Sequence, residues 1–175
     1  MEKSVRRVFD DDGFAVQRLD RAVYLGTGRI RQEEGRAGTG VDMPDVENGP
    51  VLFADTPGSE IHGAVKPLDG EPVIIKHAPD AFFQTDLHDA LSRAGIRKLV
   101  VCGMMSHMCI DTSVRAARNH GYDITLLHDA CATRDLSWNG KTIPAATVHE
   151  AFMAALHGAF ADVRTTGDFL PSLPA

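Results

Sequence analysis

The chain has 175 residues, of which 43% are hydrophobic and 24% are charged, with a formal net charge of -6. Its length suits one α/β domain, and its composition excludes a fibrous or wholly disordered protein. The acidic balance argues against a nucleic acid or an anionic membrane as the main partner. We expect a cytoplasmic protein, because no apolar run approaches the roughly 18 residues that span a bilayer and the charged N-terminus does not resemble a signal peptide.

The first 49 residues differ in composition from the rest of the chain. They are more densely charged and hold 7 of the 16 glycines. Residues 26–42 have neither helical nor strand periodicity, which indicates a loop or disorder. We therefore predict two parts, an atypical charged and glycine-rich segment at 1–49 and a folded domain at 50–175.

Short β-branched runs alternate with helix-length amphipathic segments from residue 50 onward. Near-continuous apolar runs are typical of strands that are buried on both faces, and they predict strands at 72–76, 98–102 and 123–128 and around residue 163. Apolar residues at helical spacing predict helices at 85–94, 109–120 and 143–160. This order indicates a three-layer α/β/α fold with a mostly parallel, doubly wound sheet.

Two residues with useful chemistry follow predicted strands, at the edge where open α/β sheets bind their ligands. Lys76 ends one strand, although a surface lysine at a strand end is the plainer interpretation of its position. Cys109 begins a predicted helix, where free N–H groups and the helix dipole favour a nucleophilic thiolate and can receive an oxyanion. The alternative interpretation of Cys109 is a small buried hydrophobic residue.

The remaining cysteines and histidines point less clearly to chemistry. Cys102 and Cys131 lie among apolar or small residues, so we predict that both are free thiols that pack in the core. His107 borders the proposed site and could bind substrate or donate a proton, but a structural role is also common for such a histidine. Asp86 and His88 have the spacing of some metal ligands without an obvious third ligand. We therefore expect no metal and no cofactor.

Several short motifs follow one another between about Leu52 and Leu170. They are TPGSEIH at 56–62, VIIK at 73–76, AF at 81–82, TDL at 85–87, VVCGMMSHMCI at 100–110, AA at 116–117, GY at 121–122 and DACAT at 129–133. Together they resemble the isochorismatase-like cysteine hydrolase superfamily, which includes nicotinamidases and related amide hydrolases.

The resemblance implies a catalytic set of Asp, Lys and Cys. Cys109 matches the nucleophile, which attacks an amide carbonyl, and Lys76 matches the lysine that holds the thiolate and the oxyanion electrostatically. The backbone N–H groups of Met105 and Cys109 form the implied oxyanion hole, and the implied peptide bond between Met104 and Met105 is cis. Water then hydrolyses the thioester. The implied function is therefore hydrolysis of a C–N bond, in an amide or a carbamoyl-type group of a small molecule.

The resemblance also bears on partners. Phe82, Met104 and His107 flank the implied site in the sequence, and we predict that they contact the substrate, although core packing is an equal alternative for Phe82 and Met104. The expected partner is a small-molecule amide, with no nucleic acid and no membrane. Members of the family usually form dimers or larger assemblies, so a homo-oligomer is implied.

The chain departs from the family pattern at the aspartate. In the family this residue ends the first strand, within an apolar-apolar-Ile-Asp-x-Gln pattern, and acts as the general base for the thiol. The nearest counterpart here is Asp10, but Arg6 and Arg7 replace the expected apolar residues. Neither the family's first long helix nor its second strand is found among residues 15–50. The Asp-x-His metal motif of nicotinamidases is absent ahead of the lysine, so the resemblance implies no metal.

Two hypotheses explain the first 49 residues. They are either a divergent N-terminus that still completes the sheet or the product of an altered reading frame or recombined start. In the second case the domain lacks its central first strand and its base. The function then has an alternative, a catalytically impaired domain that serves as a binding or subunit-interaction module.

Overall fold

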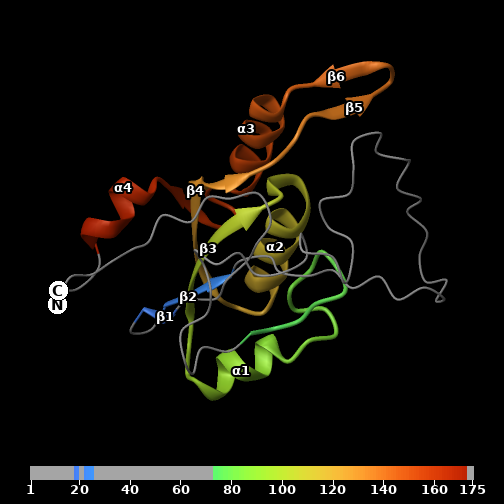
Figure 1. Cartoon of the computed structure of the whole chain (residues 1–175). Helices are drawn as coiled ribbons and strands as arrows, with labels where there is room; N and C mark the ends of the chain where they lie inside the picture. Colours follow the sequence, from blue (N-terminus) through green and yellow to red (C-terminus); the bar gives the residue numbers. More distant parts are fainter. Residues whose placement is uncertain (1–17, 20–21, 26–72, 173–175) are drawn as a thin grey trace, which may run out of the picture.

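The computed structural model describes residues 18–19, 22–25 and 73–172, and Figure 1 shows their arrangement. Most of the predicted segment 1–49 lies outside these residues, and so does Asp10. In chain order the elements are β1 (Arg18–Leu19), β2 (Ala22–Leu25), α1 (Leu87–Arg93), β3 (Lys98–Met104), the π-helix η3 (Ser106–Ile110), α2 (Asp111–Asn119), β4 (Asp123–Ala132), β5 (Leu136–Trp138), β6 (Lys141–Ile143), α3 (Ala145–Leu156), β7 (Asp162–Arg164), α4 (Thr166–Phe169) and the 3₁₀-helix η4 (Leu170–Ser172).

Five strands form the main sheet in the order β1-β2-β3-β4-β7. The pairs β2–β3, β3–β4 and β4–β7 are parallel, and only β1 is antiparallel to its neighbour. Lys98 pairs with Asp123, so β3 and β4 begin at the same level of the sheet. These two strands contain the predicted strands at 98–102 and 123–128 and extend beyond them. The mostly parallel sheet of the predicted α/β fold is confirmed.

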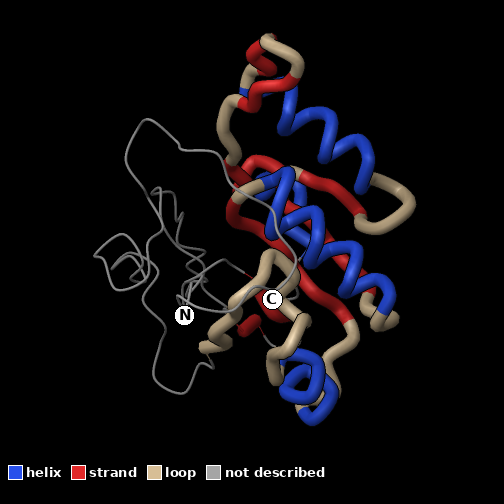
Figure 2. The backbone as a smooth tube through the Cα atoms, turned by 90° about the vertical axis from the view of Figure 1, so that its right-hand side faces the viewer, coloured by secondary structure: helices blue, strands red, loops and turns tan. Residues whose placement is uncertain are grey.

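In the described part of the chain, three helices pack on one face of the sheet, and the short α4 and η4 pack on the other. Helices α1, α2 and α3 contribute to the main core on one face (Figure 2). Successive residues of a strand point to opposite faces. Leu99 and Val101 of β3 therefore belong to this main core, whereas Val100 packs with Leu127 of β4 and Phe169 of α4 on the other face.

We did not predict β1 and β2. Residues 22–25 form a parallel strand beside β3, in a part of the chain where we had found no strand of the family pattern. Four residues are too few to show a clear period-2 alternation. The strand forms because the backbone groups along this edge of β3 require hydrogen-bonding partners.

The predicted strand at 72–76 is wrong for its described residues. Residues 73–75 have no regular secondary structure, and Lys76 forms only an isolated bridge. Val73 and Ile75 are 53% and 59% exposed. A β-branched run favours extended backbone, but a strand also requires a neighbouring strand along its length, which the composition of the run does not reveal.

The predicted helices form with different ends. Helix α1 lies within the predicted range 85–94, and α3 lies within 143–160. The helix predicted at 109–120 begins earlier, because the π-helical turn η3 leads from Ser106 into α2. Gly121 follows α2 with a φ of 83°, a left-handed value that favours glycine at the end of a helix.

A two-stranded hairpin formed by β5 and β6 extends away from the main sheet (Figure 1). We did not predict it, although its turn has a clear signal. Asn139 and Gly140 have φ values of 51° and 72°, and Asn-Gly is the preferred pair for a type I′ hairpin turn. None of the helices in the described part of the chain is long and apolar enough to cross a membrane.

Candidate active site

The fold brings Lys76 and Cys109 into direct contact. Lys76 Nζ lies 3.3 Å from Cys109 Sγ, although the two residues are 33 positions apart in the sequence. Both residues are buried, with 4% of Lys76 and 6% of Cys109 exposed. The contact lies at the carboxyl end of β3, which is the edge of the sheet where we expected the chemistry.

The ammonium group of Lys76 has three hydrogen-bond partners in this site. Besides Cys109 Sγ, its Nζ donates to the carbonyl oxygen of Ala78 at 2.8 Å and to that of Pro79 at 3.2 Å. An ammonium has three N–H donors, so each donor has an acceptor. A buried charge is tolerated only with such partners. Two of the acceptors are neutral carbonyls, and the third is the sulfur of Cys109.

The turn that presents Cys109 has an unusual backbone. The peptide bond between Met104 and Met105 is cis, as the resemblance implies. Met105 has extended backbone angles, and its carbonyl oxygen accepts hydrogen bonds from the N–H groups of Met108 and Ile110. Cys109 is the fourth residue of η3, so it lies just before α2 and not at the start of a helix as we predicted. The widened π-helical turn was not visible in the apolar spacing, which is why the predicted start was wrong.

The three predicted substrate contacts lie in different surroundings. Phe82 is in the main core, where its ring stacks on that of Tyr122 at 5.9 Å and lies tilted against that of His120 at 5.0 Å. These partners follow the C-terminal end of α2, whereas Cys109 precedes its N-terminal end. The placement of Phe82 therefore indicates packing. Met104 lies against the edge of the same core, immediately before the cis peptide bond.

His107 lies in the turn that carries Cys109, and its ring is fixed from two sides. Its Nδ1 is 2.5 Å from Thr133 Oγ1, and its ring meets the edge of Phe152. Burial lowers the pKa of His107, and the nearby positive charge of Arg134 lowers it further. The neutral imidazole is therefore favoured at neutral pH.

A second pair of residues, Ser106 and His149, was missed by our sequence analysis. Ser106 is fully buried, its Oγ donates to the carbonyl oxygen of Ala132, and it lies 2.9 Å from His149 Nδ1. With the hydroxyl hydrogen directed to Ala132, His149 must donate from Nδ1. Burial, and then the neighbouring His128, lower the pKa of His149. No local signal marks this pair, because its members are 43 positions apart.

The other two cysteines are unlike Cys109. Both are free, and both pack against the cores, as predicted. Burial raises the pKa of the Cys102 thiol to about 11, and burial together with the nearby Cys102 raises the pKa of Cys131. These thiols are therefore protonated at neutral pH and poor nucleophiles.

The predicted general base is not part of the described site. Asp10 lies outside the described residues, and Lys76 forms no ion pair with a carboxylate of a described residue. Within residues 18–19, 22–25 and 73–172, no group of three His, Cys, Asp or Glu side chains could hold a metal ion.

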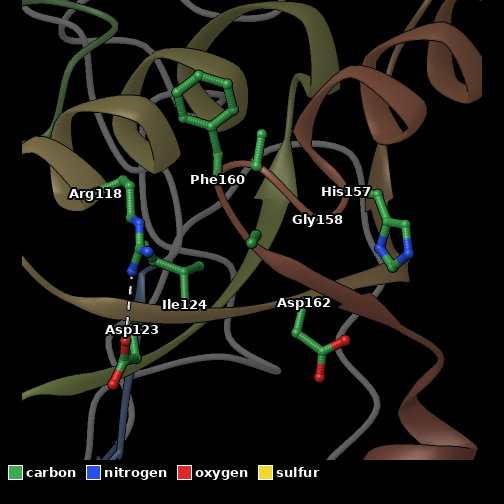
Figure 3. A pocket seen from close by; sticks show the side chains of 9 residues that line it. Arg118, Asp123, Ile124, His157, Gly158, Phe160 and Asp162 are labelled. Atoms are coloured by element: carbon green, nitrogen blue, oxygen red, sulfur yellow. Dashed lines mark hydrogen bonds and ion pairs between the residues drawn. The ribbon is translucent and has the colours of Figure 1, made fainter.

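A pocket of about 290 Å³ lies at the opposite edge of the sheet, where β4 begins (Figure 3). Its polar groups already have partners. Arg118 is paired with Asp123 at 3.4 Å, as the dashed line in Figure 3 marks, and His157 Nδ1 accepts a hydrogen bond from the backbone N–H of Val163. This pocket is separate from the contact of Lys76 with Cys109, and nothing in it suggests chemistry.

The comparison with known families agrees with this geometry. The model of the isochorismatase domain matches residues 34–168. The chain belongs to the isochorismatase family. The predicted resemblance is thereby confirmed, and the match begins within the segment 1–49 that we had set apart.

Two relatives and one solved structure illustrate the similarity. The uncharacterized isochorismatase family protein YddQ of Bacillus subtilis is 55% identical over 116 residues, which are 66% of this chain and 64% of that protein. A streptothricin hydrolase of Streptomyces noursei is 40% identical over 64% of this chain and 46% of that enzyme. The crystal structure of an isochorismatase from Pseudomonas putida KT2440 is 43% identical with a TM-score of 0.63, over 65% of this chain and 58% of that one. The chain thus spans less than two thirds of the length of each.

Proposed function

We propose that this isochorismatase-family chain is a cysteine hydrolase that cleaves the C–N bond of a small amide or carbamoyl compound through a thioester. The proposal rests chiefly on the 3.3 Å contact between Lys76 Nζ and Cys109 Sγ in a buried site. A lysine with all three N–H groups occupied is well suited to stabilise a thiolate, and a thiolate is the nucleophilic form of cysteine.

The names of relatives support the choice of bond. Besides the streptothricin hydrolase, the chain is 30% identical over 91 residues to Nicotinamidase 3 of Arabidopsis thaliana, and 32% identical over 115 residues to the ureidoacrylate amidohydrolase RutB of Variovorax paradoxus. The last two names, a nicotinamidase and an amidohydrolase, describe enzymes that hydrolyse amide-type compounds. They favour an amide or carbamoyl substrate for this chain and do not select one compound.

In the proposed first half-reaction, Cys109 Sγ attacks the carbonyl carbon and the carbonyl electrons move to the oxygen. The oxyanion is stabilised by the N–H groups of Met105 and Cys109 and by the ammonium of Lys76. As the oxyanion collapses, the C–N bond breaks, the nitrogen leaves with the bonding electrons and takes up a proton, and a thioester remains. Met104 and His107 are the proposed substrate contacts, because they flank Met105 and precede Cys109 in the same turn.

In the proposed second half-reaction, water adds to the thioester carbonyl. The C–S bond then breaks and releases a carboxylic acid, or a carbamic acid from a carbamoyl substrate, together with the thiolate of Cys109. Asp10 keeps the role of general base in this proposal. It takes the proton of the Cys109 thiol and passes it to the leaving nitrogen, and in the second half-reaction it takes a proton from the water and returns it to the thiolate.

The test measures the release of ammonia or amine from a panel of primary amides, secondary amides and carbamoyl compounds. With a substrate that the wild type hydrolyses, Cys109→Ala is expected to lower kcat by about a thousandfold or more, because the covalent route is lost. The matched control is Cys131→Ala, which removes a thiol that is protonated and packed in the core, and it should keep wild-type kcat.

A second measurement follows the alkylation of the protein by iodoacetamide at pH 7, with mass spectrometry of the labelled peptide. Faster labelling of Cys109 than of free cysteine supports the proposal. Labelling no faster than free cysteine, together with no effect of Cys109→Ala across the panel, would overturn it and favour the alternative of a binding or subunit-interaction module.

A further inference from the structure

Ser113 makes hydrogen bonds that its position in a helix does not require. A serine or threonine inside a helix commonly bonds to a carbonyl of the preceding turn of the same helix. The adjacent Thr112 does this, with its Oγ1 donating to the carbonyl oxygen of Met108 at 2.8 Å. The Ser113 hydroxyl instead accepts from the backbone N–H of Ala81 at 2.9 Å and donates to the carbonyl oxygen of Pro79 at 3.2 Å. It therefore fastens a loop from a distant part of the sequence to α2.

The fastened loop is the one that holds the ammonium of Lys76. The carbonyl oxygen of Pro79 accepts from Ser113 Oγ and from Lys76 Nζ, both at 3.2 Å. A carbonyl oxygen has two lone pairs, so this one is fully used. The bonds form a ring, from Cys109 Sγ to Lys76 Nζ, to the Pro79 carbonyl, to the Ser113 hydroxyl, and back along one continuous helical segment to Cys109.

In the described part of the chain, Lys76 is fixed by an isolated backbone bridge and by the hydrogen bonds of its ammonium. The residues before it, 73–75, have no regular structure, and residues 77–80 form a bend. The lysine side chain is flexible, and ordering it costs rotamer entropy. The position of the ammonium therefore depends on the carbonyls of Ala78 and Pro79, and the position of the Pro79 carbonyl depends on Ser113. Because Ser113 is only 4% exposed, water does not readily replace its hydroxyl.

We propose that Ser113 is a positioning residue of the active site, which holds the Pro79 carbonyl in place and thereby keeps the Lys76 ammonium against Cys109 Sγ. The inference rests on the proposed function, because it takes Cys109 as the nucleophile. Ser113 itself does not touch the reacting atoms. Its removal acts by loosening the lysine, which lowers the population of thiolate without altering the substrate contacts.

The experiment measures the rate of Cys109 alkylation by iodoacetamide against pH, in a background of Cys102→Ala and Cys131→Ala so that one thiol remains. Ser113→Ala is expected to move the midpoint of this profile up by about one pH unit and to lower the rate at pH 7 about tenfold. Ser113→Thr retains a hydroxyl and should restore the wild-type profile. The matched control is Thr112→Ala, which removes the neighbouring hydroxyl but no bond to the loop, and its midpoint should not move.

The pair Ser113→Thr and Ser113→Val extends the test in case Ser113→Ala does not fold. These two side chains have nearly the same shape and differ in a hydroxyl, so a profile restored by Thr and shifted by Val supports the proposal. A folded Ser113→Ala or Ser113→Val protein with the wild-type midpoint would overturn it, and so would a shift that Thr does not reverse.

The test separates this inference from the proposed function, because alkylation needs no substrate. If no amide is hydrolysed, the proposed function fails while the alkylation profile still decides the role of Ser113. Where an amide is hydrolysed, Ser113→Ala should lower kcat about tenfold with little change in KM. An unchanged alkylation midpoint in an active enzyme would refute the role of Ser113 alone.

Discussion

Replacing Lys76 by methionine tests whether its ammonium stabilises a thiolate at Cys109. Methionine keeps the length of the side chain and removes the charge. At 3.3 Å, the Coulomb attraction between unit charges is about 5 kcal/mol at an effective dielectric constant of about 20. Desolvation of the two buried charges offsets much of this attraction. We expect a net loss of about 1–3 kcal/mol, which corresponds to a fall in the ratio of thiolate to thiol of roughly 5- to 150-fold.

The same substitution also removes a donor from two carbonyl oxygens, of which that of Pro79 keeps the Ser113 hydroxyl as a partner. The carbonyls of Ala78 and Pro79 each accept from Lys76 Nζ, so Lys76→Met should lower the free energy of unfolding by about 1–3 kcal/mol. Iodoacetamide alkylation of Cys109 at pH 7 measures the first effect, and urea denaturation measures the second. The matched control is Lys98→Met, since Lys98 is an exposed lysine at the start of β3. Wild-type alkylation of a folded Lys76→Met protein would refute the reasoning.

Two further predictions concern stability. Burial lowers the pKa of His149 in the folded state. Below the ordinary histidine pKa near 6.5, the unfolded chain therefore binds more protons than the folded one. The contribution of His149 to stability should be complete above that pH and should fall as the pH drops toward the folded-state pKa. Urea denaturation at pH 7.5 and pH 5 should show a smaller difference for His149→Gln than for the wild type, and an equal difference would contradict the assignment. Gly121→Ala should cost about 1–2 kcal/mol, because its φ of 83° is unfavourable for a side chain although no atom lies within 4 Å of the added Cβ. A melting temperature equal to that of the wild type would show that α2 can end without this backbone conformation.

The parts of the fold that could be predicted are those in which the local pattern and the tertiary environment agree. The apolar run at 98–102 is a central strand with neighbours on both sides, so burial on both faces is visible in the sequence. The similar run at 72–76 has no ladder partner in the described chain, and the same composition therefore predicted a strand that does not form there. Strand β2 shows the opposite: its four residues lack a clear strand pattern, and they form a strand because they pair with the edge of β3.

The residues of the candidate site also fall into those that the sequence predicted and those that only the structure shows. Lys76 and Cys109 were assigned from motifs, and the structure adds their contact, which no spacing rule gives. Ser113, Ser106 and His149 were missed because each acts through hydrogen bonds to residues far away in the sequence. The residues next to a serine in an amphipathic helix do not show whether its hydroxyl bonds to a distant loop or whether the position only requires a small side chain.

The π-helical turn η3 fixes the number of residues between two anchored points. At its start Ser106 is tied to His149 and Ala132, and near its end Cys109 faces Lys76. Each residue of an ordinary helix turns the chain by about 100°. The loss of a single residue between these points would therefore turn the thiol away from the ammonium while Ser106 stayed in place. Met108, between these points, should accept changes of side chain far more readily than the turn accepts any change of length, so insertions and deletions here are expected to be excluded among active members.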